Sequence, residues 1–348
     1  DNDILYNNNY VVSKLDLFCI VIIIIMSLYC GLRTTYNDTG VYCVSFMMLD
    51  TDFTGINWSL AENPGFMIYQ LAIKFFADDN YRWLLLISAI IVVAAQVSFY
   101  KKYSFNFTFA MFLYITSGVY IFAFGALKQV IATAIVMWSF RFVEKRQWVK
   151  FYIVLALAIT IHLYAVLFAV IPFLVKSTWD KKTMLILAAT MAVGVGFSSF
   201  AGTVADVMTE MGETYTVEMM TEGEGMNIFR VIVFVVPVVI SWIYRRQINA
   251  EQNIILTLCT NLSLLAFCAM FIALFGNPIL FGRIGNYFQP FFPMMMTYCF
   301  YKYMKPQNRS LFTTCAVAGY SIFFYMSFIG YGFTEEIFYH TKLSLLFA

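Results

Sequence analysis

Two apolar stretches of the sequence contain polar side chains that are costly to place in lipid. The stretch "AFGALKQVIATAIVMW" (123–138) contains Lys128 and Gln129, and "LALAITIHLYAVLFAVI" (155–171) contains His162. Ionisable residues at membrane depth usually bind ions or move protons. A lysine can hold an anion, and a histidine can exchange a proton near neutral pH. These residues predict a site that binds an anionic group and accepts a proton, with positioning of the substrate as the alternative role of His162.

Each of these residues also has a simpler interpretation. Lys128 can extend its ammonium group from a helix end to the lipid headgroups. His162 can be a neutral core histidine that donates to a carbonyl group. Function is favoured because Gly125, Lys128 and Gln129 share one helical face with Ala132, and because His340 is the only other histidine.

The elements that must position these residues are membrane helices. Of the 348 residues, 61% are apolar and 12% are charged, and the mean hydropathy is +0.75. Soluble domains are about 25% charged, and apolar runs of about 18 or more residues predict membrane spans. The nine predicted spans are 17–33, 83–100, 104–124, 127–143, 183–201, 227–244, 253–275, 284–301 and 310–330. The sequence therefore predicts an all-α, polytopic integral membrane protein with one domain, residues 1–348.

The basic residues orient these spans, because lysine and arginine concentrate in cytoplasmic loops. Placing the basic connections on one side of the membrane puts 15 of the 22 lysines and arginines there. These connections contain Lys14 and the segments 101–102, 141–150, 176–182, 245–246 and 302–309. We expect this side to be the cytoplasm.

This orientation makes two demands on the chain. The first outer loop must be long and must include 64–77 as an interfacial or partial helix. The run 149–175 must begin and end in the cytoplasm, as a hairpin of two short helices that turns near 162–163, and such backbone is tolerated where it lines a protein cavity. One long tilted helix is the alternative, and it would invert every later loop. The predicted outer loops are 34–82, 202–226 and 276–290.

Metal and cofactor chemistry has little support in the sequence. The seven cysteines lie mostly in or at predicted helices and lack the spacing of metal ligands. Asp50 and Asp52 resemble an aspartate pair that holds a divalent cation, but three residues of an acidic loop are a weak signal. We expect no metal and no cofactor, and the net charge of +2 gives no indication of nucleic-acid binding.

Five short motifs, in their order along the chain, resemble a known family. They are "GLRTTYNDTGVY" after the first span, the turn "ENPGF", the helix start "GALKQVIATAI", the run "ITIHLYAVLF", and "RIGNYFQPFFP" near the end. Across residues 30–295 they look like the EpsG-like branch of the Wzy-type polysaccharide polymerases. The family usually has arginine before the glutamine, where this chain has Lys128; lysine keeps the charge but lacks the bidentate fork.

The resemblance implies glycosyl transfer on the outer face of a bacterial cytoplasmic membrane. The donor would be a growing glycan on polyprenyl (undecaprenyl) pyrophosphate, and the acceptor a sugar hydroxyl of one lipid-linked repeat unit. The product would be a capsule, an exopolysaccharide or an O-antigen. Membrane lipid, a flippase and a chain-length regulator are the other implied partners.

Such a reaction needs cations on the leaving pyrophosphate and a base near the attacking hydroxyl. The implied pyrophosphate ligands are Arg33, Lys128, Gln129, Arg283 and Tyr287. The candidate bases are His162, Asp38 and Glu62. In simpler interpretations the two arginines anchor at lipid headgroups, and the two carboxylates cap or turn the chain.

Two other function classes fit part of this pattern. A transporter or flippase of the same lipid-linked oligosaccharide also needs outward cations, but it should show two related halves and a cationic path to the cytoplasm. The sequence shows neither. Another lipid-linked glycan enzyme, a ligase or an acyltransferase, is the second alternative, and an acyltransferase would place its histidine towards a cytosolic donor.

Overall fold

The computed structural model describes residues 16–50, 63–210, 216–221 and 225–329. These residues are largely helical and include no strand, which confirms the all-α prediction. The helices of the first half are α1 (Leu17–Gly31), α2 (Thr39–Met48), α3 (Pro64–Ala77), α4 (Tyr81–Tyr103), α5 (Phe107–Thr116), α6 (Val119–Phe122), α7 (Leu127–Glu144), α8 (Trp148–Ile161), η2 (Leu163–Val170) and α9 (Ile171–Leu174). Those of the second half are α10 (Lys181–Val195), α11 (Phe197–Glu210), α12 (Val217–Thr221), α13 (Ile228–Ile243), α14 (Arg245–Ala250), α15 (Ile254–Ile272), α16 (Pro278–Phe288), η3 (Gln289–Phe291), α17 (Phe292–Tyr298), η4 (Cys299–Tyr303), α18 (Pro306–Phe324) and η5 (Tyr325–Ile329).

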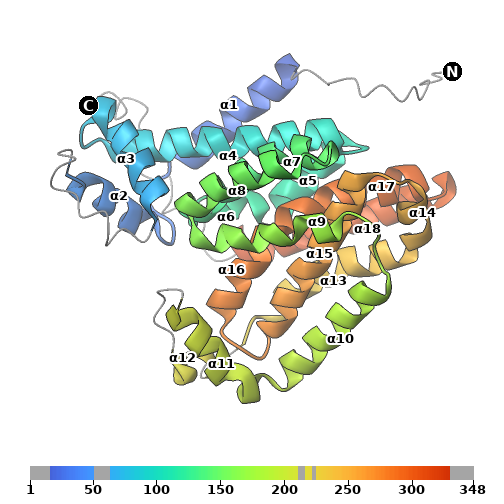
Figure 1. Cartoon of the computed structure of the whole chain (residues 1–348). Coiled ribbons are helices and arrows are strands. Elements are labelled where there is room, and N and C mark those ends of the chain that lie inside the picture. Colours follow the sequence, from blue (N-terminus) through green and yellow to red (C-terminus); the bar gives the residue numbers. More distant parts are fainter. Residues whose placement is uncertain (1–15, 51–62, 211–215, 222–224, 330–348) are drawn as a thin grey trace.

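The helices pack as a bundle in which neighbours run side by side (Figure 1). Helix α4 contacts α1 and α7, α7 contacts α8, and α15 contacts α10, α13 and α16. Aromatic rings join the two halves: Phe140 of α7 stacks on Phe291 of η3 with centroids 5.1 Å apart, and Phe99 of α4 meets both rings edge-on. The Tyr100 hydroxyl adds a buried hydrogen bond to the Pro290 carbonyl, 2.7 Å away.

The chain reverses direction at His162. Helix α8 ends there in extended backbone (φ −155°, ψ 118°), and η2 begins at Leu163. The Tyr152 hydroxyl of α8 donates to the Ala169 carbonyl of η2 at 3.1 Å, as two antiparallel arms require. The predicted hairpin over 149–175, with its turn at 162–163, is therefore present.

The basic connections meet at one end of the bundle, which we call the basic end. Three ion pairs join them: Lys101–Asp16 (2.7 Å), Lys102–Glu144 (2.8 Å) and Lys302–Glu251 (2.5 Å). The segment after α9 belongs to the same end, because Thr178 and Asn249 exchange two hydrogen bonds between backbone and side-chain amide. Both ends of the run 149–175 thus lie at the basic end.

The opposite end is formed by the starts of α2, α3 and α7, the end of α8, and α16; we call it the motif end. Described residues of the three segments predicted as outer loops contribute to it, and they include helices. Segment 34–82 contains α2 and α3, and α3 covers the 64–77 helix that the sequence predicted. Segment 202–226 contains the end of α11 and all of α12, and 276–290 contains α16.

The starts of the helices in these segments have local causes. Pro64 and Pro278 occupy first helical positions, where proline loses no hydrogen bond. The Asn277 side chain caps α16 by accepting from two backbone N–H groups. Lys74 of α3 is buried and binds the carbonyl oxygens of Phe46 and Met47, which fastens α2 to α3.

The spans are less continuous than the nine predicted runs. In the described residues, three helices are long and apolar enough to cross a membrane: Tyr81–Tyr103, Ile254–Ile272 and Pro306–Phe328. The pair Lys181–Val195 and Phe197–Glu210 is bent by 100° and makes a fourth if it counts as one span.

Two predicted spans are interrupted for identifiable reasons. The run 104–124 breaks at Gly118, whose φ of 90° favours glycine, and a Cβ there would lie 2.7 Å from the Phe328 ring. The run 284–301 changes from α16 through η3 to α17, at Pro290 and Pro293, because proline cannot continue the preceding hydrogen-bond ladder.

Candidate functional site

The five sequence motifs, which are far apart in the chain, meet at the motif end. Seven of the eight predicted site residues lie in the described residues, and Glu62 lies outside them. The seven are Arg33, Asp38, Lys128, Gln129, His162, Arg283 and Tyr287. Direct contacts join Asp38 and Gln129 to Arg283, and His162 to Tyr287. The charge of Lys128 acts on His162, and Arg33 lies behind the start of α2.

An ion pair joins the first and last motifs. The Arg283 Nη2 atom lies 3.2 Å from the Asp38 Oδ2 atom, and the two side chains are 44% and 42% exposed. The Gln129 amide donates to the backbone carbonyl of Arg283 at 2.7 Å. Gln129 is itself buried, so this bond fixes α16 against the start of α7. Solvent can therefore reach the arginine and the aspartate, whereas the buried glutamine holds the backbone of Arg283 in place.

Lys128 is half-buried and lies on the ring of Phe66, with Nζ 5.6 Å from the centroid. Phe66 belongs to the "ENPGF" motif, and the Tyr42 ring meets it edge-on with centroids 5.9 Å apart. Within the described residues Lys128 forms no ion pair. Among these residues its ammonium group therefore has hydrogen-bonding capacity left for a ligand.

His162 lies at the end of α8 with its ring beside Tyr287 of α16. The Tyr287 hydroxyl and His162 Nδ1 are 2.5 Å apart. Tyr287 is 0% exposed, whereas His162 is half-buried. The positive charges of Lys128 and Arg283 both act on the imidazole, which places the three motifs within one electrostatic environment.

Gly65 explains why the "ENPGF" turn can lie beside the histidine. A Cβ at this position would overlap the Thr160 hydroxyl and lie 2.9 Å from the Thr160 backbone carbon. Thr160 is in the last turn of α8, two residues before His162. Only glycine allows α3 to approach α8 this closely.

Arg33 takes a position behind the exposed residues. It is 1% exposed; its Nε donates to the Thr39 hydroxyl at 3.0 Å and its Nη1 donates to the Cys30 carbonyl at 2.8 Å. Thr39 is also 3.1 Å from the Phe124 carbonyl, so the arginine joins α1, α2 and the segment before α7. The Arg33 Nη2 atom is buried and has no hydrogen-bond partner.

Tyr42 is a residue of this site that the sequence analysis does not select. Its hydroxyl receives a backbone hydrogen bond from Lys128, and it senses the charges of Asp38, Arg283 and Arg33. Burial raises the pKa of Tyr42 to about 12, and the negative charge of Asp38 adds to the rise. The hydroxyl therefore stays protonated at neutral pH. The available signal was its position one helical turn after Asp38, since residues four apart share a helix face.

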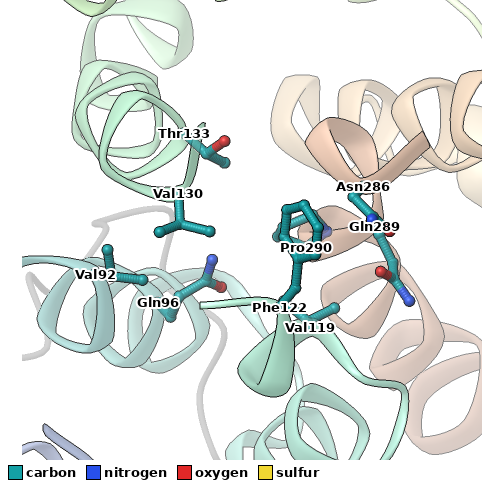
Figure 2. A pocket seen from close by; sticks show the side chains of 9 residues that line it. All are labelled: Val92, Gln96, Val119, Phe122, Val130, Thr133, Asn286, Gln289 and Pro290. Carbon is teal, nitrogen blue, oxygen red and sulfur yellow. The ribbon is translucent and has the colours of Figure 1, made fainter. Parts of the chain in front are cut away.

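A small cavity lies beneath the site, between α4, α6, α7 and α16 (Figure 2). Its volume is ≈ 10 Å³, about the space of one water molecule. It is lined by Val92, Gln96, Val119, Phe122, Val130, Thr133, Asn286, Gln289 and Pro290. This volume is too small for a sugar. A water there could donate to the Gln96 Oε1 atom, which is buried and has no hydrogen-bond partner among the described residues.

Within the described residues, no group of three or more His, Cys, Asp or Glu side chains is close enough to hold a metal ion. Asp50 is exposed after the end of α2, and Asp52 lies outside the described residues. The seven cysteines are free, and six of them are buried.

Comparison with known proteins gives one match. A family model described as the EpsG family matches residues 16–341, a range that contains every motif residue named above. No curated protein and no solved structure matches the chain.

Proposed function

The chain belongs to the EpsG family, a family of Wzy-like polysaccharide polymerase-type proteins, and from this membership we propose that it polymerises lipid-linked oligosaccharide repeat units. The donor is a glycan on polyprenyl pyrophosphate, and the acceptor is a sugar hydroxyl of a second lipid-linked unit. The observation that carries the proposal is the cation pair Lys128 and Arg283 beside His162.

Lys128 and Arg283 contact the pyrophosphate directly. Among the described residues Lys128 forms no ion pair, and the Arg283 guanidinium has one ion pair, with both side chains half-exposed. A bidentate phosphate contact is a stronger partner for arginine than an exposed carboxylate. When the pyrophosphate arrives, Arg283 turns from Asp38 to the phosphate and leaves the carboxylate free.

The reaction then needs one bond exchange and one proton transfer. The acceptor hydroxyl oxygen bonds to the anomeric carbon of the donor, and the bond from that carbon to the pyrophosphate oxygen breaks with its electron pair. The hydroxyl proton passes to a base. Asp38, freed by Arg283, lies close enough to this cluster to accept it, and His162 and Glu62 are the other candidates.

The remaining predicted ligands support these two cations. Gln129 fixes the backbone of Arg283, and Arg33 fixes the start of α2, where Asp38 lies. The unpartnered nitrogen of Arg33 adds a buried positive charge behind the phosphate. Such preorganised charge stabilises a leaving anion without reorganisation during the reaction.

The basic end lies in the cytoplasm and the motif end faces the outside. This orientation follows from the excess of lysine and arginine at the basic end. The nine membrane crossings are then made by continuous helices and by helices that are interrupted. An outward site receives repeat units from a flippase and passes chains to a length-regulating partner. The polymer is a capsule, an exopolysaccharide or an O-antigen.

Purified protein in lipid vesicles, supplied with a lipid-linked repeat unit, tests this proposal. A polymerase gives a ladder of products that differ by one repeat. The Arg283→Ala variant should form the ladder about 10²–10³ more slowly, whereas Arg245→Ala, at the basic end, should give the wild-type ladder. Transfer of the unmodified unit across the bilayer without a ladder would instead identify a flippase.

A further inference from the structure

We propose that Tyr287 is a positioning residue that fixes His162 in the tautomer with its proton on Nε2. In this form the histidine donates a hydrogen bond from Nε2 to the leaving pyrophosphate and does not serve as the base. The catalytic part of this inference rests on the proposed function, whereas the tautomer depends only on the two side chains.

The first argument is the hydrogen bond of Tyr287. Its hydroxyl is buried, and among the described residues its one hydrogen-bond partner is His162 Nδ1, 2.5 Å away. A buried hydroxyl that fails to donate leaves its proton unpaired, which is costly. The hydroxyl therefore donates and Nδ1 accepts. A neutral imidazole with an acceptor at Nδ1 has its proton at Nε2, and this proton position follows from the hydrogen-bond network.

The second argument is the charge around the ring. Among the residues that the structure describes, the charged groups that act on His162 are Lys128 from α7 and Arg283 from α16, and both are positive. Among the described residues, the phenol rings of Tyr164 in η2 and Tyr287 also lie beside the imidazole, with centroids 5.4 and 5.8 Å away. A histidine base becomes an imidazolium after it accepts a proton, and two cations oppose that change. A hydrogen-bond donor keeps its charge during the reaction, so the same cations do not oppose it.

These arguments assign the groups of the transfer step as follows. The acceptor oxygen bonds to the anomeric carbon, and its proton passes to the Asp38 carboxylate that Arg283 has released. The bond to the pyrophosphate oxygen breaks, and that oxygen leaves with the electron pair. His162 gives no proton away; its Nε2–H hydrogen-bonds to the departing oxygen beside Lys128 and Arg283. Tyr287 touches neither substrate and acts through the imidazole.

The tautomer can be measured without substrate. The chain has two histidines, so His340→Gln leaves His162 as the only imidazole signal in ¹⁵N-histidine NMR. We expect a directly bonded proton on Nε2 and none on Nδ1. In a Tyr287→Phe, His340→Gln protein the preference should fall to a mixture of both tautomers. A proton on Nδ1 in the His340→Gln protein would overturn the inference, whatever the enzyme's activity.

The role of His162 as a hydrogen-bond donor is tested by variants that put an N–H donor at different positions. Glutamine puts its amide near the position of Nε2–H, whereas asparagine puts it near Nδ1. As a donor, His162→Gln should retain activity within about tenfold of wild type, and His162→Asn and His162→Ala should lose about 10²–10³ in kcat. Tyr287→Phe should lower kcat by about tenfold with KM unchanged. A His162→Gln enzyme as inactive as His162→Ala would show that the histidine is the base.

Failure of this proposal is distinct from failure of the proposed function. If wild-type protein forms no ladder, the polymerase assignment fails while the NMR result still stands. If the ladder forms and the proton is on Nδ1, the function stands and the role of Tyr287 falls.

Discussion

The two ends of the bundle use their charges differently. At the basic end, lysines 101, 102 and 302 each form an ion pair with a carboxylate of another connection, and the Arg245 guanidinium lies 3.7 Å from the Trp242 ring. At the motif end, Lys128 forms no ion pair within the described residues and the buried Arg33 has an unpartnered nitrogen. The ion pair of Arg283 with Asp38 there is half-exposed.

This difference distinguishes structural charge from charge reserved for a ligand. Ion pairs at the basic end hold the connections together. Because lysines 101, 102 and 302 are each neutralised by a carboxylate, they leave little positive charge to attract an anionic ligand. A buried or half-buried cation without a counterion is costly for folding. Such a cost is expected where an anionic substrate supplies the missing charge, and the following predictions test that explanation.

The largest effect is expected from Arg283→Ala. Loss of a charge-assisted contact to the leaving pyrophosphate should lower the polymerisation rate by about 10²–10³. The rate is measured from the ladder assay, with the amount of folded protein determined by size-exclusion chromatography. Arg245→Ala is the matched control, because that arginine lies at the basic end. Equal losses in both variants would remove the distinction between the two ends.

Lys128→Ala should have a smaller but clear effect. Lysine makes a point-charge contact rather than a bidentate one, so we expect a loss of about 10–10² in rate. Lys128→Arg should retain most of the activity, since it keeps the charge at the helix start. An inactive arginine variant with an active alanine variant would show that the side chain only fills space beside Phe66.

Gly65→Ala should destabilise the motif end. The added methyl overlaps Thr160, and overpacking of this kind costs about 1–3 kcal/mol. The free energy of unfolding in detergent should fall by this amount. Gly40→Ala is the control, because nothing lies within 4 Å of a Cβ at Gly40. Equal stability of the two variants would show that α3 does not need this close approach to α8.

Lys102→Ala should have the smallest effect. Lys102 and Glu144 are 31% and 17% exposed, and partly exposed ion pairs contribute less than about 1 kcal/mol. Product ladders should match those of the wild type, while the unfolding midpoint falls slightly. A loss of ladder comparable with Lys128→Ala would move part of the site to the basic end.

Much of the arrangement could be predicted because it depends on local signals. Pro64 marks the start of α3, and the basic residues flanking 149–175 require the turn near His162. Once the turn is placed, topology brings the five motifs to one end. Charge and helix starts are visible in a sequence without knowledge of tertiary contacts.

Other features depend on which helix faces which, and the sequence does not encode this directly. Tyr42 enters the site because α2 lies beside the start of α7. Tyr287 lies at the start of a mostly apolar stretch of the sequence, yet its hydroxyl forms a hydrogen bond with His162 at the end of α8. The break at Gly118 depends on the Phe328 ring, which is 210 positions away along the chain. The periodicity of apolar residues indicates which face of a helix is buried, but not which other helix packs against it.

Direct binding of a lipid-linked pyrophosphate tests the central claim about the two ends. Native mass spectrometry of the purified protein with polyprenyl pyrophosphate would compare three forms: wild type, Lys128→Ala with Arg283→Ala, and Lys102→Ala with Lys302→Ala. We expect the motif-end double variant to bind at least about 100-fold more weakly, since each lost contact to a charged group costs about tenfold or more. The basic-end double variant should bind as the wild type does. Equal binding by all three forms, or a loss confined to the basic-end variant, would contradict the assignment of the pyrophosphate site to the motif end.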